Sequence, residues 1–596
     1  MCGLIVFQAP RMAAQSGMNC HAISAHDTET REAVAPDKLP PPQKLTGIGN
    51  AHLLITASPE AQMWFDQGLN LLHDFWDYES ARAFEQGVRV DPQCAMCYWG
   101  IYRAYKSNYR IETSYYQEQA LAKAVSLKNH TGKAERLYVE ASAAAEAAEK
   151  SGQKENRKGA KESEEVQLYR KLVKRDPKNM QARIFLANAL SRVGNEDLAI
   201  FTGILKEDPN NSAANHYWIH AIEASPHPEQ ALHSAEILGS LAPASGHMVH
   251  MPGHIFYRMG DYARAKESFA ASMKVDEQYM QTQHVQVDDD WNYVHNLMYA
   301  IANLLEAGEF NEAEALSAKL KDARGEVANT LYPWSPRDSI SRLNPRLPVA
   351  LRLADWTTTL ELLKSGDPAP DLPNLQFLAR QLTQFALGMQ ALDQHDLSRA
   401  EAASELFDAE LWRLSNRLKD EARAKAREKE KDKSKAGANA TPPKLQVMPD
   451  ALPDPLVSDL SVMSLELRAG LLLAKKLNDD AKKLYAQATQ EEKALGYREP
   501  PAYIRPVGET KGAAFLGVSD WTDAKAAYQE ALVERPRSGL PLYGIAMASE
   551  QAGDITAATA GYADFLAAWK SADPDLLQVA HARSYLASRD AISGSQ

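Results

Sequence analysis

Apolar and small residues recur along the chain at spacings of three and four, the pattern of paired amphipathic helices. The clearest unit is a 34-residue window that begins at residue 61. Its marker residues are Trp64, Gly68, Leu71, Phe84, Gly87 and Pro92. Small residues allow two antiparallel helices to approach closely, and a proline ends the second helix. This spacing predicts a tetratricopeptide (TPR) hairpin.

The same unit returns further along the chain. Asp176-Pro177 and Asp208-Pro209 end predicted helices 32 residues apart, and Gly260 begins a segment typical of a second TPR helix. The best repeat lies near the C-terminus, where one apolar triplet recurs 34 residues later: Ala524, Tyr528 and Ala531, then Ala558, Tyr562 and Phe565. No period-two pattern typical of strands stands out.

A helical hairpin cannot bury its apolar face alone, and stacking of successive hairpins buries it. The repeats therefore predict an all-α fold, in which TPR-like hairpins form a right-handed α-solenoid superhelix with a concave groove. The usual occupant of such a groove is a peptide or protein segment, and a small molecule is the other candidate.

Shifts in composition predict four regions. Residues 1–45 are polar with a proline-rich end and are expected to form a flexible leader. Residues 46–416 hold the N-terminal and central repeats, including a histidine-rich block at 215–296. Residues 417–455 begin as a charged helix and are expected to end as a disordered loop. Residues 456–596 hold the C-terminal repeats.

The overall charge narrows the classes of partner. The 596 residues carry a formal net charge of −12, with 45% hydrophobic and 24% charged residues. A general nucleic-acid surface needs a basic face, so we expect no nucleic-acid partner. No apolar run reaches the roughly 18 residues of a membrane helix. The N-terminal apolar run is too short for a signal-peptide core, so the chain as written predicts a cytoplasmic protein, or a periplasmic one if an export signal is missing.

Cys94 and Cys97 form a C-x-x-C pair, but Tyr98 stands where a c-type haem site needs histidine. A second pair with zinc-site spacing is absent, and no βαβ pattern surrounds this one. Two buried small residues at the start of a helix are the first interpretation. Redox or metal chemistry is the alternative.

Histidines cluster in one stretch. Nine of the 16 histidines lie between Asn215 and Asn296, where an even spread would place about two. His216 and His220 are four residues apart and share one helix face, with Glu223 on or near the same face. His250 and His254 have the same spacing, but Pro252 lies between them. We therefore expect a helix that begins at Pro252, with His247 and His250 in the preceding loop.

Successive first helices of TPR hairpins lie side by side, near residues 213–224, 252–259 and 292–305, and this arrangement would bring their histidines together. Several imidazoles with a carboxylate would suit zinc, iron or copper. The candidate ligands are His216, His220, His247, His250, His254 and His295. Glu223 and Glu499 are the candidate acid/base groups. We expect His227 and His233 to be surface residues, and His284 is a weak candidate in a polar loop.

Two other interpretations of the cluster stay open. The same groups could line a polar pocket without a metal. They could also be structural histidines that pack against Tyr217, Trp218 and Phe256 and bond to helix ends. The cluster matches no known zinc signature, because it has neither an HExxH motif nor a finger of cysteines and histidines.

Several blocks of the chain resemble a family of large bacterial TPR-repeat proteins of uncharacterised function. These blocks are AQMWFDQGLNLLHDFWDYESARAFEQGVRVDPQCAMCYWG, NHYWIHAIEAS, GHMVHMPGHIFYRMGDY, the HN pair at 295–296 and EPPAYIRPVGETKGAAFL. They span roughly residues 52–570. The resemblance implies a helical repeat fold and often export, and it favours a site at the six candidate ligands. The chain departs from the family at Trp76-Asp77, Cys97 and Tyr503, which puts a role for the first of these positions in doubt.

Two functions follow from these patterns. The first is a TPR-type protein that binds a ligand or protein partner in its groove and holds a divalent transition metal at the histidine-rich site. The second is a metal-dependent hydrolase or oxidase/oxygenase that uses the same cluster. Fold alone does not choose between them.

Overall fold

The computed structural model of the chain describes residues 30–32, 35–107, 114–151, 162–191, 195–285, 287, 290–323, 336–365, 372–432, 444–446 and 454–593. These residues divide into two compact units. The first unit takes the described residues within 1–255, 267–293 and 441–447. The second takes those within 256–266, 294–440 and 448–596.

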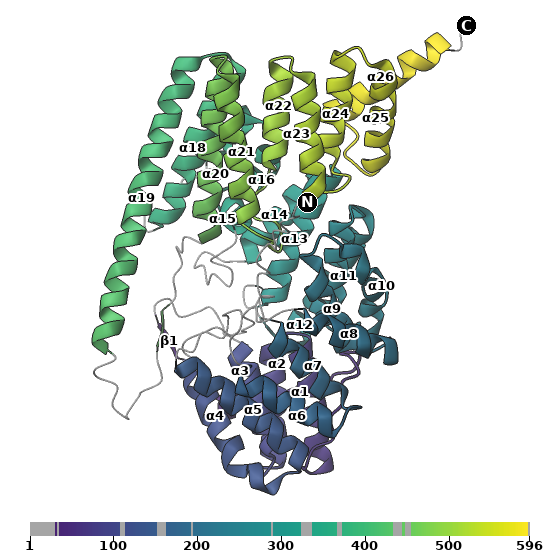
Figure 1. Cartoon of the computed structure of the whole chain (residues 1–596), viewed down its shortest axis with the longest axis vertical. Helices are drawn as coiled ribbons and strands as arrows, with labels where there is room; N and C mark the ends of the chain where they lie inside the picture. Colours follow the sequence, from purple (N-terminus) through teal and green to yellow (C-terminus); the bar gives the residue numbers. More distant parts are fainter. Residues whose placement is uncertain are drawn as a thin grey trace, which may run out of the picture. The chain divides into compact units, whose positions relative to one another are not determined.

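The first unit is built mainly from short helices (Figure 1). Its elements are β1 (Thr30–Glu32), η1 (Pro36–Lys38), α1 (Pro59–His73), α2 (Asp77–Val90), α3 (Ala95–Ser107), α4 (Ser114–Leu127), η3 (Lys128–His130), α5 (Lys133–Lys150), α6 (Glu164–Arg175), α7 (Met180–Leu190), α8 (Glu196–Glu207), α9 (Ser212–Glu223), η4 (Pro228–Ala231), α10 (Leu232–Leu241) and β2 (Lys444–Gln446). Three helices contribute residues to both units: α11 (Gly246–Arg258), α12 (Tyr262–Gln283) and α13 (Trp291–Ala307).

The first hairpin shows why the predicted marker residues matter. Ser58 caps α1 by accepting the N–H of Ala61 at 3.3 Å, and a short turn leads into α2. The ring of Phe84 on α2 then fills the space between Gly68 on α1 and Gly100 on α3. A Cβ atom at Gly68 would lie 2.8 Å from that ring, and one at Gly100 would lie 2.3 Å from it. The close approach of the three helices therefore requires glycine at both positions.

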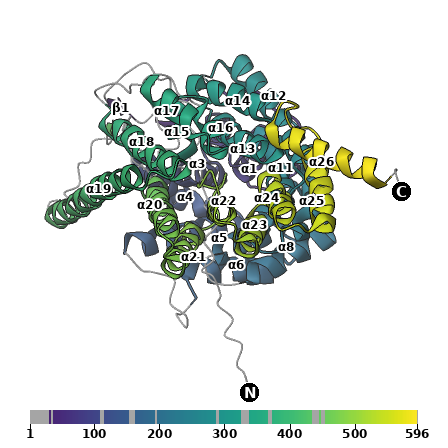
Figure 2. The same cartoon turned by 90° about the horizontal axis from the view of Figure 1, so that it is seen from above.

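The second unit continues the same architecture. Its helices after α13 are α14 (Phe310–Ala323), α15 (Pro336–Leu343), α16 (Leu347–Arg352), α17 (Trp356–Ser365), α18 (Pro373–Asp393), α19 (Leu397–Asp432), α20 (Asp454–Ala474), α21 (Asn478–Ala494), α22 (Val507–Gly517), α23 (Trp521–Glu534), α24 (Gly539–Gln551), α25 (Ile555–Ala568) and α26 (Leu577–Ser593). The hairpins α20–α21, α22–α23 and α24–α25 follow one another side by side, seen nearly end-on in Figure 2.

The structure confirms the predicted fold class: an all-α chain of TPR-like helical hairpins. Gly260, predicted to begin a second TPR helix, has a positive φ of 74°, and Gly308 and Gly553 have similar values of 77° and 78°. Glycine adopts this conformation without strain. The helices before Asp176 and Asp208 end where predicted. β1 and β2, of three residues each, form a small antiparallel pair in the first unit.

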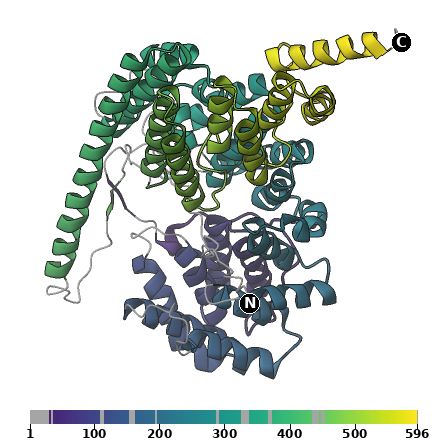
Figure 3. The ribbon, with the colours of Figure 1, turned by 45° about the horizontal axis from the view of Figure 1, so that its top comes forward.

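The region predicted as a charged helix followed by a loop begins as expected. The charged residues form the end of α19, which runs to Asp432 as the long green helix of Figure 3. Most of the predicted loop, and residues 1–29 of the predicted leader, lie outside the described residues. The four predicted regions stay predictions.

The expected start of the helix at Pro252 was wrong. Helix α11 begins at Gly246, so His247 and His250 lie on it and Pro252 lies inside it. Proline lacks the N–H that would bond to the carbonyl four residues earlier, that of Met248, and such a position costs helix stability. Packing of the largely buried α11 offsets this cost, since Met248, Met251 and Ile255 are all fully buried.

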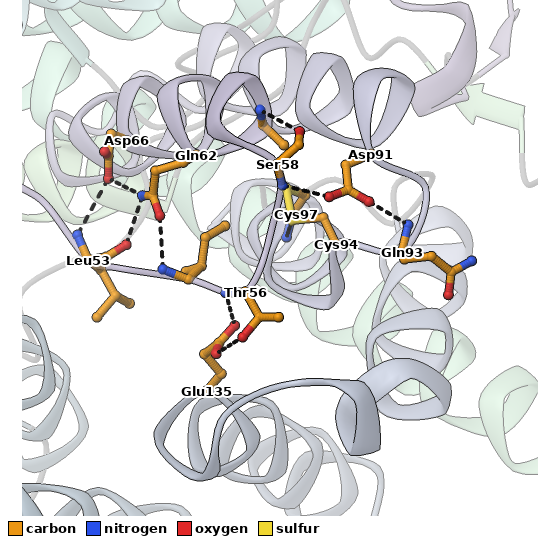
Figure 4. Close-up of a disulfide and its surroundings, with 12 residues drawn as sticks. Leu53, Thr56, Ser58, Gln62, Asp66, Asp91, Gln93, Cys94, Cys97 and Glu135 are labelled. Atoms are coloured by element: carbon orange, nitrogen blue, oxygen red, sulfur yellow. Dashed lines mark hydrogen bonds between the residues drawn. A yellow bond between two sulfur atoms is a disulfide. The ribbon is translucent and has the colours of Figure 1, made fainter.

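Cys94 and Cys97 form a disulfide at the start of α3 (Figure 4). Both cysteines are fully buried, as the first interpretation expected, but the disulfide between them was not part of that interpretation. The surrounding polar contacts tie the segment before α1 to its neighbours: Asp91 accepts the N–H of Ser58 at 2.8 Å, and Glu135 accepts the N–H of Thr56 at 2.8 Å.

Among the helices that the described residues form, none has both the length and the hydrophobicity that a membrane span requires.

Candidate metal centre

Two helices of the first unit bring five of the predicted histidines into one array. α9 supplies His216 and His220, and α11 supplies His247, His250 and His254. The ring centroids of His216 and His220 are 4.8 Å apart, and that of His247 lies 5.0 Å and 5.8 Å from them. The array continues through His250, 5.9 Å from His247, to His254, 4.6 Å further on. The rings of His220 and His254 lie close together, with centroids 6.4 Å apart.

One imidazole nitrogen each from His216, His220 and His247 lie within 4.8 Å of one another. Three imidazoles on one zinc ion at 2.0–2.1 Å place their nitrogens about 3.4 Å apart. Small side-chain rotations would bring the three nitrogens from within 4.8 Å to this separation. Among the described residues of the first unit, this is the group whose ligand atoms already converge.

The other ring nitrogen of each of the three histidines meets an oxygen. Nδ1 of His216 lies 2.6 Å from the carbonyl oxygen of His73. Nδ1 of His220 lies 2.7 Å from Glu223, and Nδ1 of His247 lies 3.2 Å from the side-chain oxygen of Asn292. A carbonyl or carboxylate oxygen only accepts, so Nδ1 carries the proton in each ring. Nε2 therefore keeps its lone pair, which is the tautomer that a metal ligand needs.

Two of these Nε2 atoms have no hydrogen-bond partner although they are buried, those of His216 and His220. An unpaired buried acceptor costs stability, and native proteins seldom tolerate one without a reason. A bound cation at the convergence of the rings would satisfy both atoms.

Phe75, in the turn between α1 and α2, forms one wall of the group. Its ring centroid lies 4.7 Å from His216, 5.3 Å from His220 and 5.6 Å from His247. Phe75 also has a φ of 59°, in the left-handed region that side chains other than glycine seldom adopt. Such strain, of about 1–3 kcal/mol, persists only where the surroundings impose it, and it gathers at functional sites.

Burial favours the neutral form of three imidazoles in and beside the array. Burial, reinforced by the nearby His220, lowers the pKa of His216 well below its usual value. Burial also lowers the pKa of His254, against the opposing effect of Glu223. Burial lowers the pKa of His73 to about 4. Neutral imidazole is the form that binds metal, so the ring of His216 is available to a metal ion at neutral pH.

Glu223 lies between two histidines rather than facing open space. Its Oε1 atom lies 2.7 Å from Nδ1 of His220, and its Oε2 atom lies 2.5 Å from Nδ1 of His254. Burial alone would raise the pKa of Glu223, but electrostatic interaction and hydrogen bonds with the two histidines lower it on balance. An ionised carboxylate that accepts from two imidazoles orients both rings. The acid/base role predicted for Glu223 stays a prediction.

Two other predicted residues belong to the second unit. His295 is fully buried on α13 and Glu499 is half-buried in the loop before α22, both in the second unit. His227 is exposed and faces Glu229, as expected. His233 lies on α10, and His284 follows α12.

Sequence reasoning missed three groups that shape the site: the carbonyl of His73, the ring of Phe75 and the side chain of Asn292. The first belongs to a backbone, which a sequence pattern does not single out. Phe75 lies in the block HDFWDY, next to the Trp76-Asp77 departure from the family pattern. Asn292 lies in the block DDDWNYVHN, where only the histidine drew notice.

The chain matches no protein-family model and no curated protein. Solved structures resemble it distantly. Yeast Tom70 is 14% identical, with a TM-score of 0.27 over 89% of this chain and 96% of that one. A human IFIT1 dimer with m7Gppp-AAAA is 11% identical, with a TM-score of 0.28 over 87% of this chain and 92% of that one. At such low identities and TM-scores, these likenesses carry no argument about what this chain binds.

Proposed function

We propose that this TPR-type helical repeat protein binds a divalent transition metal ion through His216, His220 and His247 of its first unit. The observation that carries the proposal is the convergence of three imidazole nitrogens within 4.8 Å, with every Nδ1 facing an oxygen. Oxygen partners on the second nitrogen are the usual support of metal-binding histidines, because they fix the tautomer and the orientation of the ring.

The donor set limits the metal. Neutral imidazoles suit zinc, copper and iron, whereas magnesium and calcium prefer oxygen ligands. Burial lowers the pKa of His216, so protons compete little with a metal ion for that ring at neutral pH. We therefore expect tight binding of zinc or copper at neutral pH.

Three protein ligands leave one coordination position for another molecule. In a binding protein this position would hold part of a peptide, protein segment or small molecule that occupies the groove. In a metal-dependent hydrolase or oxidase, the alternative function, it would hold water or dioxygen. The observation that favours the alternative is that three protein ligands converge, whereas structural zinc sites have four.

The test is elemental analysis by mass spectrometry of tag-free protein. We expect at least one equivalent of metal per chain in the wild type, and one equivalent less in His220→Ala. His220 is the partly exposed member of the group, so its replacement should leave the fold intact. His227→Ala is the matched control, because that histidine is exposed and paired to a surface glutamate.

Wild-type protein without metal, even after dialysis against zinc, would refute the proposal. An unchanged metal content in a folded His220→Ala variant, checked by circular dichroism, would refute it as well. The predicted participation of His295 and Glu499 rests on the sequence, and His295→Ala in the same assay tests it.

A further inference from the structure

The imidazole array extends beyond the three histidines of the proposed site. Nε2 of His250 lies only 2.6 Å from Nε2 of His254, and both side chains are fully buried. Nδ1 of His254 faces Glu223 and carries the proton, so its Nε2 directs a lone pair at His250. A proton fits between the two nitrogens as they stand, and an ion would fit once the rings turn apart to the roughly 3.4 Å that separates imidazole nitrogens on one zinc ion.

Glu223 connects this pair to the first three histidines. One oxygen holds His220 and the other holds His254, at 2.7 Å and 2.5 Å. Each Nε2 points away from Glu223, because the two nitrogens lie on opposite edges of the ring. The same carboxylate therefore turns one Nε2 toward His216 and His247 and the other toward His250.

We propose that the first unit holds a second divalent transition metal position at His250 and His254, coupled to the first through Glu223. The inference rests on the proposed function, because Glu223 orients a ligand of each position. Imidazole donors give both positions the same preference for zinc, copper or other late first-row ions. Glu223 is a positioning residue in this arrangement and orients one ligand of each ion.

A proton offers the simpler explanation of the short contact. If His250 carried its proton on Nε2, it would donate to His254, and no second ion would be needed. The two arrangements differ in a measurable count: one metal ion per chain, or two.

The test uses full-length protein stripped of metal with a chelator and titrated with Zn²⁺ in a calorimeter. Wild type is expected to bind two equivalents. His220→Ala and His250→Gln are each expected to bind one, and the double variant none. His250 is fully buried, so it is replaced by glutamine, which keeps most of the side-chain volume. Thermal unfolding checks that each variant folds.

Glu223→Leu tests the coupling. Leucine offers no acceptor to either imidazole, so both Zn²⁺ affinities should fall about 10–100-fold. Glu229→Leu is the matched control, since Glu229 contacts the exposed His227 at 3.2 Å, and it should leave both affinities unchanged.

The failures of the two proposals are distinguishable. One equivalent in the wild type that is lost in His220→Ala and kept in His250→Gln would overturn the second position and leave the proposed function standing. Two equivalents that survive in His250→Gln would place the second ion elsewhere and also overturn the inference. An affinity loss at only one position in Glu223→Leu would overturn the coupling. No Zn²⁺ binding at all would overturn both proposals.

Discussion

The carboxyl group of Glu466 lies in the core of the second unit, where it accepts the hydroxyl proton of Tyr503. Burial raises the pKa of Glu466 from 4.5 to about 7, although Tyr503 and Thr510 oppose the change. The folded protein therefore keeps this proton at pH values where the unfolded chain has lost it. Stability from this group is complete below pH 4.5 and is lost as the pH rises toward 7.

Glu466→Gln removes this titration and keeps an acceptor for Tyr503. We expect the free energy of unfolding of the wild type to fall by about 3 kcal/mol relative to the variant between pH 4.5 and pH 8. Urea unfolding of both proteins across this range measures the difference. A constant difference would show that Glu466 titrates alike in the folded and unfolded chains.

Phe75 and Glu223 illustrate what a single residue contributes to the candidate site. Neither is a metal ligand in the proposed arrangement. Phe75 packs against three imidazoles, and Glu223 holds two of them by Nδ1. The geometry of the ligands therefore depends on residues that carry no metal chemistry of their own.

At the scale of single helices, stability depends on how closely neighbouring helices pack. Gly100 on α3 faces the ring of Phe84, which a Cβ atom would approach to 2.3 Å. Gly100→Ala must push apart α2 and α3 or force the buried ring from its rotamer. Overpacking of this kind costs about 1–3 kcal/mol.

Gly517→Ala is the control for Gly100→Ala. Gly517 is the last residue of helix α22, and a Cβ atom there would meet nothing within 4 Å. Thermal unfolding should show a lower melting temperature for Gly100→Ala only. Equal melting temperatures would mean that Phe84 moves without cost.

Helix α11 shows how an element can break a local rule. Its interior proline would end the helix in an exposed setting, yet the helix begins six residues earlier. This earlier start places His247 on the same helix as His250 and His254. The candidate site thus depends on a helix that local propensity alone disfavours.

Long-range ion pairs act at the scale of the whole second unit. Glu306 on α13 accepts from Arg352 on α16 and from Arg535 after α23, each at 2.7 Å, and Ser538 donates to it at 2.6 Å. Burial opposes the ionised form, but the two arginines lower the pKa of Glu306 to about 2. Arg352 also pairs with Glu509 on α22. Residues more than 200 positions apart are joined in one buried network.

Glu306→Gln leaves two buried guanidinium groups short of a counter-charge. Loss of one partner of a buried pair costs about 3–5 kcal/mol, and we expect that loss in the free energy of unfolding at neutral pH. Glu401→Gln, which breaks an exposed pair with Lys475, should change it by less than about 1 kcal/mol. Equal effects in chemical denaturation would contradict the structural role of the network.

The sequence by itself determined the repeat architecture and the part of the candidate site that lies on helix α9. Helical hairpins follow from the spacing of apolar and small residues, because a helix is built from bonds between residues four apart. The same periodicity placed His216, His220 and Glu223 on one face of α9.

Only the tertiary structure decided which side chains meet. Glu223 and His254 are 31 residues apart, His247 and Asn292 are 45 apart, and His216 meets the backbone of a residue 143 positions earlier. Such partners depend on how neighbouring helices pack. The same packing allows helix α11 to continue across Pro252. The spacing of residues along one helix is a local property, whereas the tautomer and direction of each imidazole are set by groups that distant segments supply.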